Sequence, residues 1–111
     1  MAGQMHGFGI MEKAPLSGVR YDAYEPWKYN CIELHDDDLM ELAPQYNKID
    51  MYWHTMDVPG KGLAYYGITL IPPEAAGEMD AVTPKDPRFH TIKELLSAAW
   101  TEGKFIIHFG I

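Results

Sequence analysis

Four short segments of this chain alternate apolar and polar residues, and this alternation is the feature that most constrains the fold. They span residues 27–34, 48–56, 63–71 and 104–111. Successive side chains of a strand point to opposite faces, so the alternation predicts four strands that each turn one face toward a core. The expected core residues on that face are Ile32, Leu34, Ile49, Met51, Trp53, Phe105, Ile107 and Phe109.

Two other segments have the spacing of apolar residues that is typical of helices. In residues 36–46, Leu39 and Leu42 recur on one face behind three aspartates, whose negative charge suits the positive end of a helix dipole. Residues 91–102 carry a similar apolar stripe and are followed by Gly103, which can adopt the left-handed conformation that ends a helix. We therefore expect one helix in each segment.

The order of elements from Trp27 onward is then β-α-β-β-α-β. This order predicts an α+β domain of the ferredoxin-like sandwich type, with a four-stranded antiparallel sheet and both helices on one face. We expect residues 27–111 to form this single domain and residues 1–26 to form an N-terminal arm. The arm has a short strand near Phe8–Met11, which in an alternative arrangement adds a fifth strand to the sheet. Residues 72–89 are expected to form a long loop with at most one helical turn.

The face of the sheet turned away from the helices is expected to lack a cover of its own. Such a face mixes aromatic and polar residues, which is typical of a surface covered by a partner or a ligand. Cys31 and Thr69 share this face. The candidates for binding or interface residues are Tyr29, Glu33, Asp50, Tyr52, His54, Tyr65 and His108.

The net charge excludes several classes of partner. Sixteen acidic and nine basic residues give a formal charge of −7, which repels nucleic acid and anionic membrane surfaces. A basic protein or a cationic or neutral small molecule remains compatible with this charge. The single cysteine, Cys31, and the absence of a signal-peptide or membrane-span pattern predict a cytoplasmic protein.

The histidines allow two kinds of chemistry, and neither has a specific motif. His35, His54 and His108, with Glu33 or Asp50, are the ligand types that zinc accepts, but their spacing matches no metal-binding pattern, so we expect neither metal nor cofactor. His54 could act as a general base with a carboxylate and a tyrosine beside it. Alternate positions on a strand lie about 7 Å apart, so neighbours on that face line a groove without touching as a catalytic triad must.

These features favour a binding module over an enzyme. The leading hypothesis is a domain that binds a partner, in particular a second copy of itself, through the aromatic sheet face. The aromatic stretch that contains Tyr21, Tyr24 and Trp27 could also fill a slot on a partner. One alternative is a small enzyme or small-molecule-binding protein with a pocket around His54 under the 72–89 loop. Another is an acidic inhibitor of a basic protein.

Overall fold

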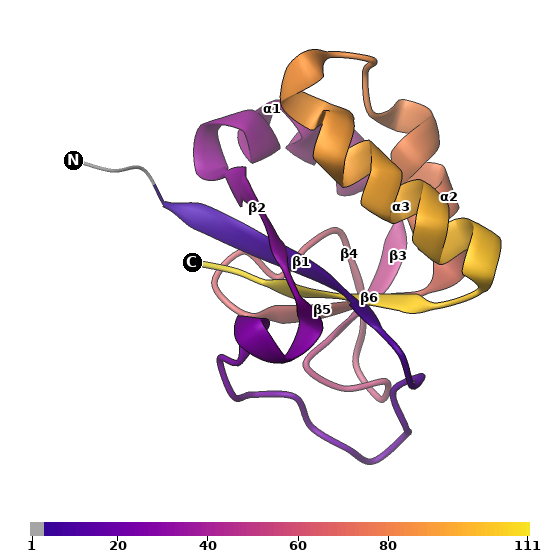
Figure 1. Cartoon of the computed structure of the whole chain (residues 1–111). Coiled ribbons are helices and arrows are strands. Elements are labelled where there is room, and N and C mark those ends of the chain that lie inside the picture. Colours follow the sequence, from indigo (N-terminus) through magenta and orange to yellow (C-terminus); the bar gives the residue numbers. More distant parts are fainter. Residues whose placement is uncertain (1–3) are drawn as a thin grey trace.

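The computed structural model describes residues 4–111, which form an α+β domain with an antiparallel sheet and three α-helices (Figure 1). In chain order the elements are β1 (Met5–Met11), the 3-10 helix η1 (Pro26–Tyr29), β2 (Ile32–His35), α1 (Asp36–Tyr46), β3 (Asp50–Trp53), β4 (Pro59–Lys61), β5 (Ile68–Ile71), α2 (Pro73–Val82), the 3-10 helix η2 (Pro87–Phe89), α3 (His90–Glu102) and β6 (Phe105–Phe109). None of the helices between residues 4 and 111 has the length and apolar character required to cross a membrane.

The sheet has six strands in residues 4–111, in the order β2-β1-β6-β5-β3-β4, with every neighbouring pair antiparallel. The expectation of four strands is therefore wrong, and the ferredoxin-like topology is not confirmed. The short strand expected near Phe8 runs from Met5 to Met11 and lies inside the sheet, between β2 and β6. The N-terminal region up to Met11 thus supplies an inner strand to the sheet.

The three helices pack on one face of the sheet and enclose the larger core (Figure 1). This core contains the expected residues Leu34, Ile49 and Met51. The segment that was expected to be a loop contains α2 instead. Pro73 stands at the first helical position, where its missing N–H costs nothing, and Ala76 and Met79 turn a buried stripe toward the core.

The opposite face of the sheet is also covered, by the chain itself. We call residues 12–31 and 54–58 the covering layer; Figure 1 shows its longer segment crossing below the sheet from the end of β1. Side chains of this layer pack against a second buried cluster on the sheet: Met11, Ile68, Leu70, Ile107 and Phe109. The expectation that this face lacks a cover is therefore wrong.

Strand β6 explains why the two faces were assigned incorrectly. Phe105, Ile107 and Phe109 were expected beneath the helices, but they belong to the second cluster, and Ile106 packs in the helix-side core. Apolar residues occupy both faces of this strand, so alternation alone could not determine its orientation. Strands buried on both faces read as continuous apolar runs.

One glycine on β1 allows the covering layer to lie directly on the sheet. A methyl group added at Gly9 would come within 2.6 Å of the Cβ atom and the carbonyl oxygen of Tyr29. The same group at Gly7 would lie 3.5 Å from Cys31 Cβ, an ordinary contact. Only glycine therefore fits the closest approach, at position 9.

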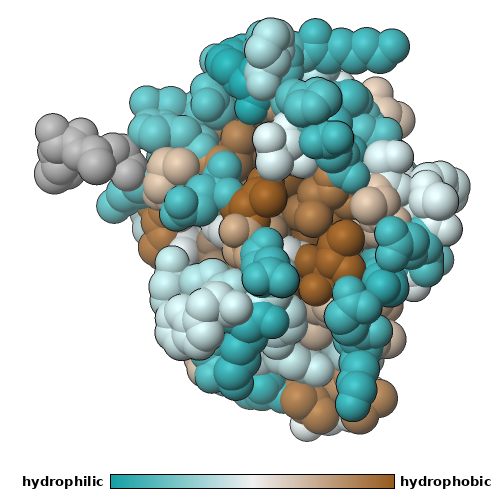
Figure 2. Space-filling view, viewed as in Figure 1, coloured by the Kyte–Doolittle hydropathy of each residue, from teal (hydrophilic) through white to brown (hydrophobic). Residues whose placement is uncertain are grey.

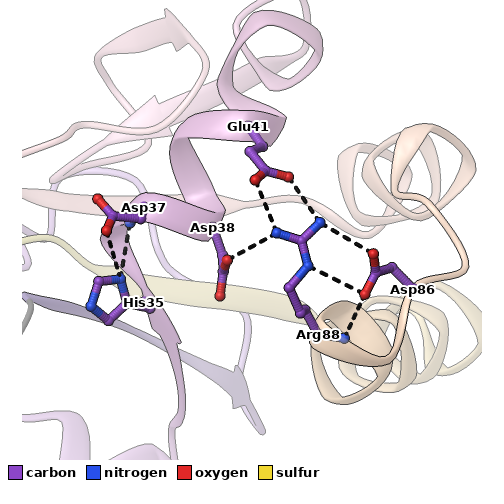
Figure 3. Close-up of polar contacts among 6 residues, drawn as sticks. All are labelled: His35, Asp37, Asp38, Glu41, Asp86 and Arg88. Atoms are coloured by element: carbon purple, nitrogen blue, oxygen red, sulfur yellow. Dashed lines mark hydrogen bonds and ion pairs between the residues drawn. The ribbon is translucent and has the colours of Figure 1, made fainter.

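A surface ion-pair network joins α1 to the segment before α3. The Arg88 guanidinium donates two parallel hydrogen bonds to Glu41, of 2.9 and 3.0 Å, and further bonds to Asp38 and Asp86 (Figure 3). At the start of α1, His35 rather than an aspartate caps the helix, because its Nδ1 accepts a hydrogen bond from the backbone N–H of Asp37 (Figure 3). These exposed groups connect the ends of elements that also share the helix-side core.

The contrast between Gly9 and Gly7 yields a prediction about packing. Gly9→Ala forces the Tyr29 backbone away from β1, so we expect the free energy of unfolding to fall by about 1–3 kcal/mol. Gly7→Ala, two residues away on the same face, is the matched control and should change it by less than about 1 kcal/mol. Urea unfolding of both variants measures the difference. Equal stability of the two variants would contradict the close approach of the covering layer.

Candidate functional site

A cleft of about 440 Å³ opens where the covering layer meets the ends of β1, β5 and β6. We call it the His54 cleft. Its walls include Met5, Asp22, Tyr24, His54 and Tyr66. These residues come from separate parts of the sequence, and the antiparallel pairing of β1 with β6 and of β6 with β5 brings their segments together.

His54 lies at a bend immediately after β3, not within a strand. Its backbone has a φ of 64°, a left-handed conformation that few residues other than glycine adopt. Two hydrogen bonds hold this bend: the His54 N–H donates to Ile68 O at 2.9 Å, and its carbonyl accepts from the Tyr21 N–H at 2.7 Å. The covering layer and β5 together fix the position of the imidazole.

The imidazole of His54 is oriented by Asp22. Its Nδ1 lies 2.8 Å from Asp22 Oδ1 and 3.2 Å from Tyr21 O, and because both partners are acceptors, Nδ1 carries a proton. Nε2 of the neutral ring is then an acceptor. It has no hydrogen-bond partner among residues 4–111 and is not among their buried unpaired atoms, so it is at least partly exposed to solvent.

Asp22 is an exposed carboxylate with two partners. Its Oδ2 accepts a 2.7 Å hydrogen bond from Arg20, and its Oδ1 faces His54. The Arg20 hydrogen bond is the main cause that lowers the pKa of Asp22, and His54 contributes less. Asp22 is therefore ionised at neutral pH and can fix the tautomer of His54.

Exposed aromatic rings surround the cleft. Tyr66 is 81% exposed and Tyr24 is 63% exposed, although both have contacts that position them. Tyr24 packs edge-on against Phe109, and Tyr66 packs edge-on against its neighbour Tyr65. A second hollow of about 410 Å³ shares Met5 and Tyr24 with the cleft and extends along β2 past Trp27 and Glu33.

On the helix side of the same strand ends lies a buried chain of hydrogen bonds. His6 and His108 are both fully buried, with His6 Nδ1 2.9 Å from His108 Nε2. His6 Nε2 lies 2.9 Å from Asp36 Oδ1, and Thr69 Oγ1 lies 3.0 Å from His108 Nδ1. The Tyr65 hydroxyl donates to the other oxygen of Asp36 at 2.8 Å.

The direction of each hydrogen bond in this chain follows from Asp36. The bonds from His6 and then Tyr65 lower its pKa, so it is ionised and accepts a hydrogen bond from the N–H at His6 Nε2. In the neutral pair, His6 Nδ1 then accepts from His108 Nε2, and His108 Nδ1 accepts from the Thr69 hydroxyl. Every buried polar side-chain atom in this row of hydrogen bonds is thereby paired, which a buried network requires.

The seven residues singled out from the sequence do not form one face. His54 lies in the cleft and Glu33 in the adjoining hollow, whereas Tyr29 and Tyr52 pack against the second buried cluster. Asp50 is exposed and pairs with Lys61 at 2.7 Å.

Tyr65 and His108 belong to the buried chain on the helix side, as does Thr69. Their assignment to the face opposite the helices is therefore wrong. His108 was assigned to the wrong face because apolar residues occupy both faces of β6. Thr69 was assigned wrongly for the same reason, since β5 is buried along its whole length.

Sequence reasoning did not identify Asp22, Tyr66, His6 and Asp36 as site residues. Asp22 and Tyr24 lie in the aromatic stretch before η1. The rings of this stretch indicated a possible contact surface, but nothing in its sequence indicated that Asp22 orients a histidine. Asp36 was interpreted only as part of a helix start. The contacts of Asp22 with His54 and of His6 with Asp36 and His108 join segments far apart in the chain, so no local pattern could reveal them.

The pocket proposed under residues 72–89 is not the one that contains His54. That segment forms α2 and η2 on the helix side, and it contributes no wall to the His54 cleft as the described residues define it.

In residues 4–111 no three histidine, cysteine or acidic side chains are grouped so that they could hold a metal ion. Burial raises the pKa of Cys31 to about 11, which keeps its thiol protonated at neutral pH.

Comparison with known proteins gives no relative from which a role could be inferred. No protein-family model, curated protein or solved structure matches this chain.

The buried imidazole of His108 predicts an acid-sensitive fold. Burial, and then the proximity of His6, lowers the pKa of His108 well below 6.5. Below about pH 6.5 the unfolded chain therefore binds more protons than the folded one. The free energy of unfolding then decreases as the pH is lowered, by up to about 1.4 kcal/mol per pH unit for one proton. Asp36, whose pKa is lowered, adds a loss only in the much more acidic range where carboxylates titrate.

Urea unfolding at several values between about pH 7 and pH 5 measures this dependence. We expect His108→Gln to reduce the slope of stability against pH. His90→Gln, which alters an exposed histidine, is the control and should leave the slope unchanged. The same slope in His108→Gln and in the unmodified protein would contradict this prediction.

Proposed function

We propose that this protein is a non-enzymatic binding domain that associates with a second copy of itself through the outer surface of the covering layer. The supporting observation is the distribution of exposed large apolar side chains in residues 4–111. Of ten such residues, three lie on the α-helices; the other seven lie on the covering layer or around the His54 cleft: Met5, Leu16, Val19, Tyr24, Trp27, Val58 and Tyr66. Met5, Tyr24, Trp27 and Tyr66 line two adjoining hollows, and exposed apolar groups that gather in this way are typical of interaction surfaces.

Aromatic residues of the layer have the properties of interface anchors. Trp27 is 70% exposed, and the 3-10 helix η1 that carries it is fixed close to β1 by the approach of Tyr29 to Gly9. Exposed tryptophan and tyrosine side chains on a rigid support contribute disproportionately to protein interfaces. Figure 2 shows surface of intermediate hydropathy at the lower left, over η1, as expected for such rings.

The charge distribution favours a second copy as the partner. Residues 12–31 contain three acidic and three basic residues, so this segment is neutral and the rest of the chain carries the whole charge of −7. Two copies of an acidic protein repel each other over most of their surfaces. They can approach with the least repulsion where the segment from residue 12 to residue 31 faces its counterpart.

Two alternatives have weaker support. An enzyme is supported by the Asp22–His54 pair, but in residues 4–111 no hydroxyl or thiol side chain is hydrogen-bonded to His54 Nε2, as an activated nucleophile would be. An acidic inhibitor of a basic protein is supported by the net charge alone. A mild excess of acidic residues is also explained by solubility.

Trp27→Ser tests the proposal because it removes the most exposed aromatic ring of η1. We expect the unmodified protein to form a dimer in sedimentation velocity and light scattering, and Trp27→Ser to weaken the dimer by about 2 kcal/mol, close to thirtyfold. Trp100→Ser, which removes a 56% exposed tryptophan from α3, is the matched control and should leave the dimer intact.

Thermal unfolding of both variants shows whether either change disturbs the fold. A protein that stays monomeric at high concentration would refute self-association. A dimer that Trp100→Ser abolishes and Trp27→Ser does not would place the interface on the helices and contradict the proposal.

A further inference from the structure

We infer that the His54 cleft is a binding site for a small organic cation, namely a protonated amine attached to a flat ring. The cleft shares Met5, Tyr24 and Tyr66 with the surface proposed for self-association, so the test below is designed to separate the two. Three features of the described residues carry the inference: aromatic rings at the mouth, the sign of the charges in the walls, and an oriented hydrogen-bond acceptor inside.

The aromatic rings provide the first contact. Tyr24 and Tyr66 both line the cleft and both are largely exposed, so their ring faces are available to a ligand. The face of an aromatic ring attracts cations, and clusters of such rings recognise organic ammonium groups. Met5 adds a flexible apolar wall that a ring can pack against.

The wall charges disfavour an anion. Asp22 lines the cleft and Glu33 lines the hollow that continues from it, while neither set of walls within residues 4–111 includes a lysine or arginine. Arg20 compensates Asp22 in part from outside the cleft. The chain as a whole carries −7, so its field also attracts cations.

The imidazole supplies a directed acceptor. Asp22 and the Tyr21 carbonyl hold the Nδ1 proton of His54, which leaves the Nε2 lone pair for an N–H of the amine. The ring rests against Gly67, where an added methyl carbon would lie only 2.4 Å from Nε2, so a side chain at that position would displace it. The contacts of Nδ1 with Asp22 and Tyr21 hold the ring in place before any ligand arrives, which lowers the entropy that binding must overcome.

The size of the cleft suits a compact ligand. Its volume of about 440 Å³ lies at the lower end of the range usual for small-molecule sites. A single ring with a short aminoalkyl arm is small enough for this volume, with its ammonium group between the tyrosine rings and the imidazole and its ring against Met5.

The test compares three probes of the same shape and different charge. Benzylammonium, benzyl alcohol and benzoate are titrated into the full chain, with amide and histidine ring resonances followed by NMR. We expect benzylammonium to shift His54, Tyr66 and Gly67 saturably, benzyl alcohol to bind more weakly, and benzoate to cause no saturable shift at these residues. The same titration of Trp27→Ser separates ligand binding from self-association.

Two variants locate the site. Tyr66→Ala removes an exposed ring, and His54→Asn removes the imidazole while keeping a residue type that tolerates the left-handed backbone. Each should weaken benzylammonium binding about fivefold or more, whereas Met40→Ala on α1 should not. Equal binding of benzoate, saturable shifts located elsewhere, or unchanged affinity in both cleft variants would overturn the inference.

Discussion

Burial of the central strands on both faces is the constraint on which the rest of this structure depends. β5 and β6 are almost wholly inaccessible to solvent, so the sheet requires apolar cover on its second face as well as on its helix side. The chain provides that cover with an irregular segment in place of helices. Gly9 makes the arrangement sterically feasible, since it lets the backbone of Tyr29 contact β1 directly.

The candidate site is a consequence of this arrangement. The covering layer passes the end of β3. There the Tyr21 N–H donates to the His54 carbonyl, the Tyr21 carbonyl accepts from His54 Nδ1, and Asp22 contacts the imidazole. The cleft therefore forms at a junction between the layer and the strand ends, and its chemistry comes from residues that are more than thirty positions apart. On the other side of the same strand ends, the His6–His108 pair links β1 to β6 and, through Asp36, to α1.

Part of the fold could be predicted from the sequence, where a periodic pattern had one interpretation. The helix spacing in residues 36–46 and the glycine stop at Gly103 agree with α1 and α3. The orientation of β6 could not be predicted, because apolar residues occupy both of its faces. The strand near Phe8–Met11 was expected, with its addition to the sheet as an alternative, but its inner position between β2 and β6 could not be predicted, because Gly7 and Gly9 interrupt its side-chain pattern.

The site was less accessible to prediction than the fold. His54 was recognised as a candidate, but its role depends on a backbone bend and on Asp22, neither of which leaves a local signal. The aromatic residues Tyr24 and Trp27 were recognised as surface candidates, yet their position outside the sheet became clear only from the covering layer.

The most direct test of the covering layer is to measure the proximity of its aromatic rings to Phe109 by NMR. The ring centroids of Tyr24 and Phe109 lie 5.6 Å apart, and those of Tyr29 and Phe109 lie 6.0 Å apart. The account predicts nuclear Overhauser cross-peaks between these rings and no accessibility of Phe109 to a soluble paramagnetic agent. Absence of the cross-peaks, together with strong paramagnetic broadening of the Phe109 ring, would show that the second face of the sheet is open and would contradict it.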